Sequence, residues 1–193
     1  MNKPLFNTFD SMPFIPYNIV AHLANDPVAD DLFKLLKYNT YDAISQPSLS
    51  LKEKMSMIYK NQPQQNDYNI FLNRLVEDEE TAERTILKVY KNNSDPIIAQ
   101  RATICYEFDI LVGAKIPMID YQGLPCRRTD VIEMILLKSL NGAEIDGTVG
   151  WFQFNDDLSR YCKSAMGIGN NTNYEGTAIV MAVQLGNLND TGC

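Results

Sequence analysis

The chain has 193 residues, of which 45% are apolar, and a formal net charge of −7. This length and apolar share predict one globular domain with a substantial core. The negative charge argues against a nucleic-acid-binding protein, because contacts to phosphates need clustered Lys and Arg side chains. No stretch approaches about 18 uninterrupted apolar residues, so no membrane span is expected.

The cysteines and the N-terminus bear on the compartment. Cys105, Cys126, Cys162 and Cys193 have no CxxC or other close spacing. We therefore expect free thiols in a reducing compartment. The first residues lack the apolar stretch of a signal peptide.

Two helices are predicted near the N-terminus. Asn18 is expected to cap the first. Asp26 followed by Pro27 predicts the start of the second, because an N-cap aspartate and a proline at the first helical position favour helix initiation. The second helix is expected to reach about Lys37. Its apolar stripe has helical spacing and consists of Val28, Leu32, Leu35 and Leu36.

A third, shorter helix is predicted after a loop. Ser50 and Glu53 fit a capping box, which would open a helix that continues to about Tyr59. A polar loop follows, and residues 68–72 are a predicted strand. The acidic run 77–80 is interpreted as a solvated turn.

The longest predicted element is a β-hairpin. Residues 84–91 form its first strand and residues 97–112 its second, which alternates apolar and polar side chains with the period of a half-buried strand. The second strand could span roughly 50 Å at about 3.3 Å per residue. We expect part of this hairpin to contact another chain. The predicted turn between its strands consists of Asn92, Asn93, Ser94, Asp95 and Pro96.

The last third of the chain contains one more helix and two strands. Residues 113–125 are predicted to be a loop, and Thr129 caps a helix that Asn141 and Gly142 end. Residues 147–154 and 177–185 are predicted strands.

This order of elements predicts an α+β fold. It would be an antiparallel sheet with a long β-hairpin, packed by the N-terminal pair of helices and by one helix between strands. The predicted organisation is an N-terminal arm (1–16), a single domain (17–186) with loop insertions (61–80 and 155–176), and a frayed tail (187–193).

Two carboxylates in the hairpin are the best candidates for chemistry. Glu107 and Asp109 lie on the polar face of the second strand and could bind a divalent cation together with Asp67 or the 77–80 run. A metal-dependent nuclease is the functional interpretation of this pattern, and a solvated strand face is the favoured one. His22, the single histidine, has no identifiable partners, which favours a structural or surface role.

Two further patterns have structural interpretations that we favour. Trp151, with Phe152 and Phe154, could stack on bases, but its strand has no basic residue, so a core or subunit-interface role is favoured. The Gly-x-Gly of Gly167 and Gly169 neither follows a strand directly nor opens a helix, so a flexible loop is favoured over a dinucleotide site.

The sequence resembles the neck and tail-completion proteins of tailed bacteriophages, the head–tail connector and tail-terminator class. The element order is similar across residues 17–186: a helix, a long hairpin, a helix and two closing strands. Local similarity is found in Leu-Leu-Lys-Tyr-Asn (35–39), Ser-Gln-Pro (45–47) and Leu-Lys-Glu-Lys (51–54).

The resemblance implies a non-enzymatic virion protein, assembled in the host cytoplasm, without cofactor or metal. It would form a ring of six or twelve copies between the portal or adaptor and the tail tube, and DNA would pass through without specific binding. The acidic balance is consistent with a conduit that repels phosphates. The interface candidates are Asn92, Asn93, Ser94, Asp95, Pro96, Glu107, Asp109, Asn170 and Asn171.

Overall fold

The computed structural model describes residues 8–62, 65, 68–74, 84–98, 101–154, 163–166 and 174–186. In these ranges the chain has a mixed six-stranded sheet, a separate two-stranded sheet, and helices before and between the strands. The predicted α+β class is therefore confirmed. The main sheet is not wholly antiparallel, because its first strand runs parallel to its neighbour.

The N-terminal helices follow from local capping. A 3-10 helix, η1 (Thr8–Phe14), leads into α1 (Ile15–Asn25), so helical structure begins within the predicted irregular arm 1–16. The side chain of Asp26 then accepts a hydrogen bond from the backbone N–H of Val28 at 2.9 Å and caps η2 (Pro27–Ala29). The chain continues into α2 (Asp30–Lys37), as predicted.

The third helix has the predicted capping box. The backbone N–H of Glu53 donates to the hydroxyl of Ser50, and the backbone N–H of Ser50 donates to the carboxylate of Glu53 at 2.8 Å. This cap opens α3 (Leu51–Ser56), which follows η3 (Ala43–Ser45) and is shorter than predicted.

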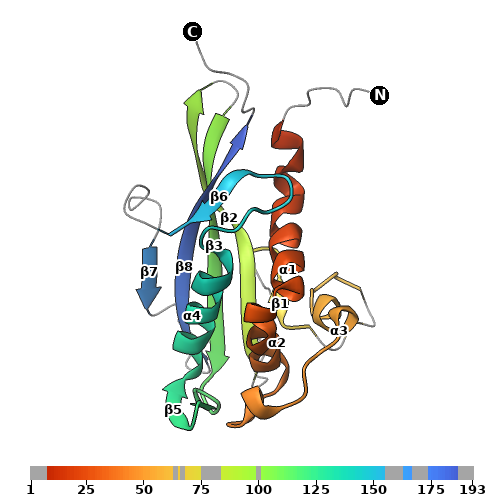
Figure 1. Cartoon of the computed structure of the whole chain (residues 1–193), viewed down its shortest axis with the longest axis vertical. Helices are drawn as coiled ribbons and strands as arrows, with labels where there is room; N and C mark the ends of the chain where they lie inside the picture. The colour runs from red at the N-terminus through yellow and green to blue at the C-terminus, as the bar shows by residue number, and fades with distance from the viewer. Residues whose placement is uncertain are drawn as a thin grey trace.

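The long hairpin forms the centre of the sheet (Figure 1). Its strands are β2 (Thr85–Ile98) and β3 (Arg101–Gly113), paired antiparallel from Thr85 opposite Val112 to Ile98 opposite Arg101. At about 3.3 Å per residue each strand spans roughly 45 Å, much longer than a usual strand.

The turn of this hairpin was placed wrongly by the sequence. Asn93, Ser94, Asp95 and Pro96 pair with residues 105, 104, 103 and 102 of β3, so 92–96 is strand and not a turn. Residues 99 and 100, between the two strands, lie outside the described residues. Pairing with a long apolar strand outweighs the local turn preference of these residues.

The other strands extend the sheet on both sides of the hairpin. β8 (Tyr174–Gly186) runs antiparallel along the whole of β3, and both β6 (Val149–Gln153) and β7 (Lys163–Met166) pair with β8. On the other side, β1 (Ile70–Phe71) pairs parallel with β2 at Leu87 and Lys88.

Several predicted segments lie partly or wholly outside the described residues. β7 and the first residues of β8 fall inside the predicted loop 155–176, whose other residues are not described. The tail 187–193 and half of the 61–80 insertion are not described either, so the domain boundaries stay predictions.

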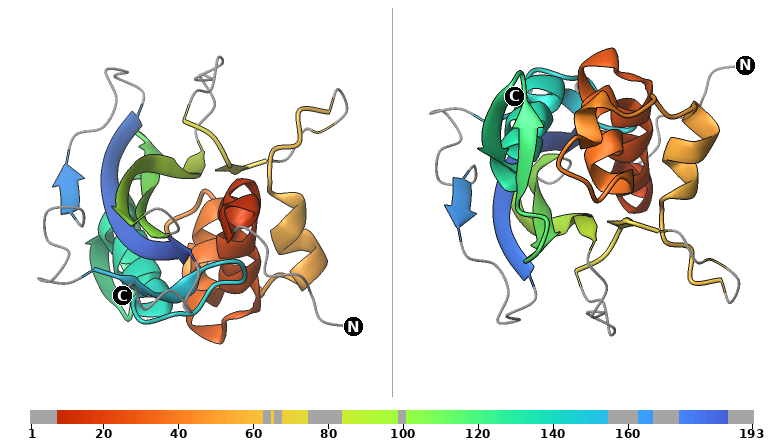
Figure 2. Two further views of the ribbon diagram at one scale, coloured as in Figure 1. Left: turned by 90° about the horizontal axis from the view of Figure 1, so that it is seen from above. Right: turned by 90° about the horizontal axis from the view of Figure 1, so that it is seen from below.

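One face of the sheet carries the main core. α4 (Arg128–Leu140) packs on β3 and β8, while α1 and α2 pack on β2, and Figure 2 shows these helices together along one side of the curved sheet. Beneath them lie the fully buried side chains of Ile104, Tyr106, Phe108 and Ile110. These are the residues that the alternation in the sequence placed on one face.

A buried arginine joins the helices. The guanidinium of Arg128 donates to the carbonyl oxygens of Leu35, Tyr38 and Thr40 at 2.8, 2.9 and 2.7 Å, and to that of Ile116 at 3.1 Å. These carbonyls include the end of α2, where a cation is favoured by the helix dipole. Arg128 thereby ties the end of α2 to the start of α4.

A second hairpin replaces part of the predicted loop 113–125. β4 (Met118–Tyr121) and β5 (Leu124–Arg127) form the two-stranded sheet, below α4 in Figure 1. Gln122 and Gly123 have φ angles of 56° and 81°, which fit a two-residue hairpin turn of the primed type. The two prolines made this segment look irregular in the sequence.

Candidate functional site

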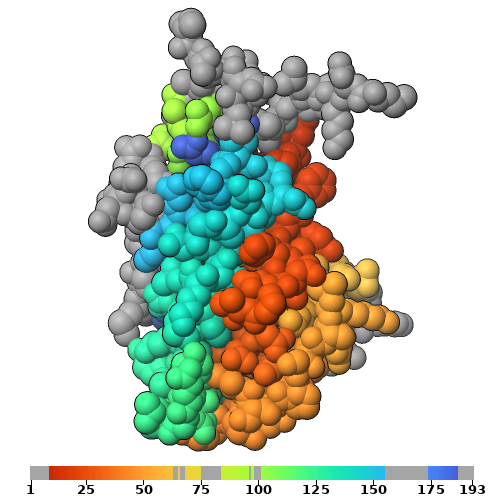
Figure 3. Space-filling model, in the orientation of Figure 1, coloured from red at the N-terminus to blue at the C-terminus, as the bar shows by residue number. Residues whose placement is uncertain are grey.

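The distal half of the hairpin, residues 91–98 of β2 with 101–105 of β3, is the candidate site. In Figure 3, the helices cover most of the sheet and the hairpin is visible only at the end that extends beyond them. Lys91, Asn92, Asn93 and Ser94 are exposed there, and the apolar side chain of Ile97 is 48% exposed.

The outer edge of β2 is open along this half. β1 pairs only with Leu87 and Lys88, and beyond Lys88 the described residues contain no strand other than β3 beside β2. We call residues 89–98 of β2 the open edge. An open edge presents backbone N–H and C=O groups that can pair with a strand of another chain.

A bulge shapes the open edge. Lys91 lies opposite Tyr106 and Asn93 opposite Cys105, so Asn92 is an extra residue in β2. Its amide donates a hydrogen bond to the carboxylate of Glu107 on β3. A bulge bends the strand and increases its twist, so the contact with Glu107 helps to set the direction of the edge beyond it.

The remaining edge residues fit this position in the sheet. Pro96 has no backbone N–H, and proline within sheets is confined to edge strands and bulges. A second irregularity in the register lies between Pro96 and Ile98. The predicted candidates of segment 92–96 therefore lie in a strand at the open edge and not in a turn.

The other two predicted candidates on the hairpin differ in exposure. Glu107 is half-buried, whereas Asp109 is only 5% exposed. The predicted solvated strand face is wrong for Asp109. The reason is its neighbourhood on β2, where the buried side chains of Lys88 and Tyr90 lie beside it.

The buried carboxyl of Asp109 has a partner across the strands. The hydroxyl of Tyr90 donates to Oδ2 of Asp109 at 3.0 Å. Burial raises the pKa of Asp109 to about 6, the hydrogen bond from Tyr90 opposes that rise, and the charge of Glu107 adds to it. Burial, and then the negative charge of Asp109, raises the pKa of Tyr90, which keeps its hydroxyl a donor.

Sequence reasoning did not single out Tyr90 or its bond to Asp109. The two residues are 19 positions apart, and only the register of the two strands brings them together. A displaced turn in the prediction displaced this register as well.

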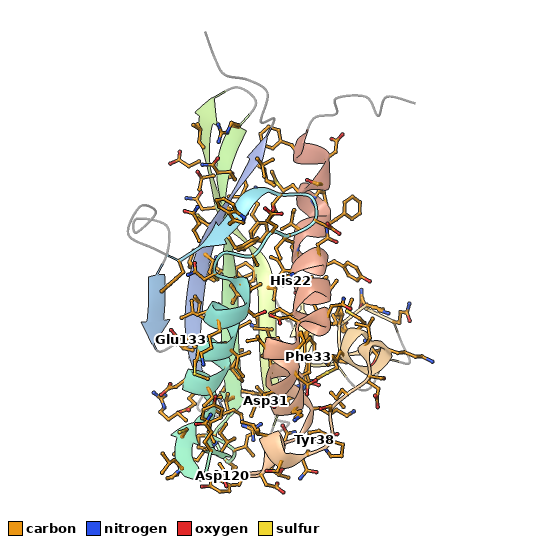
Figure 4. All side chains as sticks on the ribbon, in the orientation of Figure 1. His22, Asp31, Phe33, Tyr38, Asp120 and Glu133 are labelled. Carbon is orange, nitrogen blue, oxygen red and sulfur yellow. The ribbon has the colours of Figure 1, made fainter. Side chains whose placement is uncertain are left out.

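The described residues do not assemble the metal site considered from the sequence. In those residues, no group of three or more His, Cys, Asp and Glu side chains could hold a metal ion. Asp67 and the 77–80 run lie outside the described residues. Figure 4 shows His22 on α1, apart from the labelled acidic residues Asp31 and Glu133.

The aromatic strand divides between core and surface. Phe152 is fully buried in the main core, whereas Trp151 is 56% exposed and donates from Nε1 to the carboxylate of Glu144 at 2.9 Å. The predicted core role therefore holds for Phe152 and in part for Phe154, which is partly buried against the same core, and not for Trp151. Gly167, Gly169, Asn170 and Asn171 lie outside the described residues.

Two observations concern the compartment. Cys105 and Cys126 form no disulfide in the described part of the chain, and Cys162 and Cys193 lie outside it. No helix in the described ranges is both long enough and apolar enough to cross a membrane.

Comparisons with known proteins give one family. The model of the YomW family matches residues 29–183, which is well over half of the chain and includes both strands of the hairpin. No curated protein matches the chain.

Proposed function

We propose that this chain, which belongs to the phage-type YomW family, is a structural protein of the phage particle. It forms a ring in the neck, as a head–tail connector or tail terminator, between the portal or adaptor and the tail tube. Six or twelve copies surround the channel through which DNA passes without specific binding.

The open edge of β2 is the observation that carries this proposal. A strand edge of this length, exposed at one end of the molecule, is a surface for pairing with another chain. Among the described residues, the sheet ends at β2 beyond the short β1 on one side, and at β6 and β7 on the other. Contact between different edges of successive copies is heterologous, and such contacts give a ring where the rotation closes.

The proposed role is not enzymatic. The carboxylates of Glu107 and Asp109 accept hydrogen bonds from Asn92 and Tyr90, and Asp109 is buried. A metal-dependent nuclease would need an accessible pair and further ligands, and the described residues bring none to it. The net charge of −7 supports a channel wall that does not retain DNA.

Native mass spectrometry of two matched variants tests the proposal. Ile97→Lys places a charge on the open edge, and Leu124→Lys places the same charge on β5, where the side chain is 65% exposed. We expect the first to reduce the ring to monomers and the second to leave it intact. Because 93–96 pair with β3, a substitution tests the edge better than a deletion of 92–96 would.

Two results would contradict the proposal. One is a ring of unchanged mass for Ile97→Lys, which would show that the open edge makes no contact between copies. The other is a native protein that stays monomeric at high concentration. A circular dichroism spectrum equal to that of the native chain excludes misfolding of either variant.

A further inference from the structure

A polar chain crosses the outer face of the hairpin and is interrupted at one atom. Tyr90 donates to Oδ2 of Asp109, and Asn92 donates to the carboxylate of Glu107. Between them, Oδ1 of Asp109 is buried and has no hydrogen-bond partner in the part of the chain that the structure describes. Glu107 lies two residues before Asp109 on β3, and its charge and its hydrogen bonding both raise the pKa of Asp109.

One proton completes this chain. With both groups ionised, two negative carboxylates face each other and a buried oxygen lacks a donor, which is unfavourable. With a proton on Oδ1, Asp109 donates to Glu107 and still accepts from Tyr90 at Oδ2. The hydrogen-bonded chain then runs without interruption from Tyr90 through Asp109 and Glu107 to Asn92.

We propose that Glu107 and Asp109 share one proton, and that this proton operates a latch on the Asn92 bulge and so on the shape of the open edge. Taking the proton makes Glu107 a fixed acceptor for Asn92, and losing it places two repelling charges beside the bulge. The consequence for assembly rests on the proposed function, whereas the latch itself does not.

The groups around the pair include one buried cation that opposes the proton and uncharged residues on β8. Lys88 is buried and lies directly opposite Asp109 on β2. Its positive charge favours the charged form of Asp109, although the two form no ion pair among the described residues. The positive charge of Arg74 lowers the pKa of Tyr90, against the larger effect of burial. β8 brings the uncharged Ala178 and Val180 opposite Asp109 and Glu107. On the other side of β8, the pairing with β7 brings Lys163 opposite Val180.

Other observations favour a proton over a divalent cation. The pair has only two carboxylates, and Lys88, which is buried opposite Asp109 on β2, already brings a positive charge to it. Burial and the charge of Glu107 hold the pKa of Asp109 at about 6, within reach of mildly acidic conditions. A hard divalent cation takes six or more oxygen ligands.

Carboxyl NMR of the full chain measures the shared proton directly. In the native protein we expect Asp109 to titrate about two pH units above an ordinary aspartate. In Glu107→Gln the new amide donates to Asp109, so its midpoint should fall by more than about one unit, a tenfold loss of proton affinity. Asp146→Asn, which removes an exposed carboxylate elsewhere, should leave the midpoint unchanged.

Hydrogen exchange of segment 91–98 measures the latch. After correction for intrinsic exchange, we expect greater protection at about pH 5 than at about pH 7.5 in the native chain. In Asp109→Asn the amide accepts from Tyr90 and donates to Glu107, so protection should be high at both pH values. If this variant does not fold, Glu107→Gln tests the same point.

Three results would overturn the latch. They are an ordinary midpoint for Asp109, a midpoint that Glu107→Gln does not move, and protection of 91–98 that is independent of pH in the native chain. Restoration of protection by millimolar Ca²⁺ at neutral pH would overturn the proton in favour of a cation. A titrating pair in a monomer would contradict the proposed ring only, and a ring without a titrating pair would contradict the latch only.

Discussion

The hydroxyl of Tyr90 donates a hydrogen bond to the carboxyl of Asp109 at 3.0 Å, across the two strands of the long hairpin. Tyr90 is buried and directly precedes the exposed residues 91–94 of β2, and Asp109 is its buried partner on β3. This contact therefore marks where the covered half of the hairpin passes into the half that is open to another chain.

Replacement of Tyr90 by phenylalanine should weaken this junction. Oδ2 of Asp109 would lose the one donor it has among the described residues, and a buried acceptor without a partner costs about 1–3 kcal/mol. The lost hydrogen bond lowers the pKa of Asp109 in the native protein, so that pKa should rise in the variant. Urea unfolding should show a larger loss of stability at neutral than at acidic pH, and an equal loss at both would contradict this role.

The stability of the native chain should depend on pH through Asp109. Its pKa is about 6 in the folded protein and 3.8 in the ordinary state. The folded state therefore binds more protons in this window, and the contribution of Asp109 falls as pH rises from about 4 to about 6. The change is on the order of 2–3 kcal/mol. Denaturant unfolding at a series of pH values measures it, and Asp109→Asn should lack it.

Arg128 and its neighbour provide a matched pair for stability. Arg128→Met would leave four carbonyl oxygens without their donor, so we expect a loss of at least about 3 kcal/mol. Arg127→Met would remove only ion pairs with Asp130 and Glu175 at 3.6 and 3.5 Å near the surface, which are worth less than about 1 kcal/mol. Equal losses in chemical denaturation would refute the structural role of Arg128.

The hydroxyl of Ser50, which caps α3, should contribute more to stability than the hydroxyl of Ser56 at the end of the same helix. Ser50→Ala removes the acceptor for the backbone N–H of Glu53 and should cost about 1 kcal/mol. Ser56 donates only to the carbonyl of Glu53 within the same short element, so Ser56→Ala should cost less than about 0.5 kcal/mol. Thermal unfolding compares the two, and the reverse order would show that the capping box does not stabilise the helix.

Gly147 is expected to tolerate no side chain. Its φ is +88°, and an added Cβ would lie 2.9 Å from Cβ of Ser11 and 3.2 Å from Cδ1 of Ile15. Gly142 has a similar φ of +87° and no atom within 4 Å of an added Cβ. Gly147→Ala should therefore destabilise the chain by more than Gly142→Ala, by about 1–3 kcal/mol. Similar melting temperatures for the two variants would contradict the close packing of Ser11 and Ile15 against Gly147.

The predictability of each element followed the range of its interactions. Ser50 and Glu53 are three residues apart, and Asp26 caps a helix that starts one residue later, so both starts could be predicted from the sequence. The alternation in β3 likewise predicted the buried face that carries Tyr106 and Phe108. Each of these signals is complete within a few residues.

Features that depend on the partner strand could not be predicted. Asn93 and Pro96 favour turns when taken alone, and only the register with β3 shows that they are strand. The burial of Asp109 depends on Lys88 and Tyr90, which lie about twenty residues earlier in the chain. The sequence predicted that the candidate site lies on the hairpin, but its geometry depends on how the two strands pair and could not be predicted.

Native mass spectrometry of the purified, unmodified chain over a range of protein concentrations tests the central claim most directly. Pairing through the open edge of β2 predicts one discrete ring mass, of six or twelve copies, that forms as concentration rises. A single monomer mass at every concentration would contradict the claim that this edge joins copies of the chain.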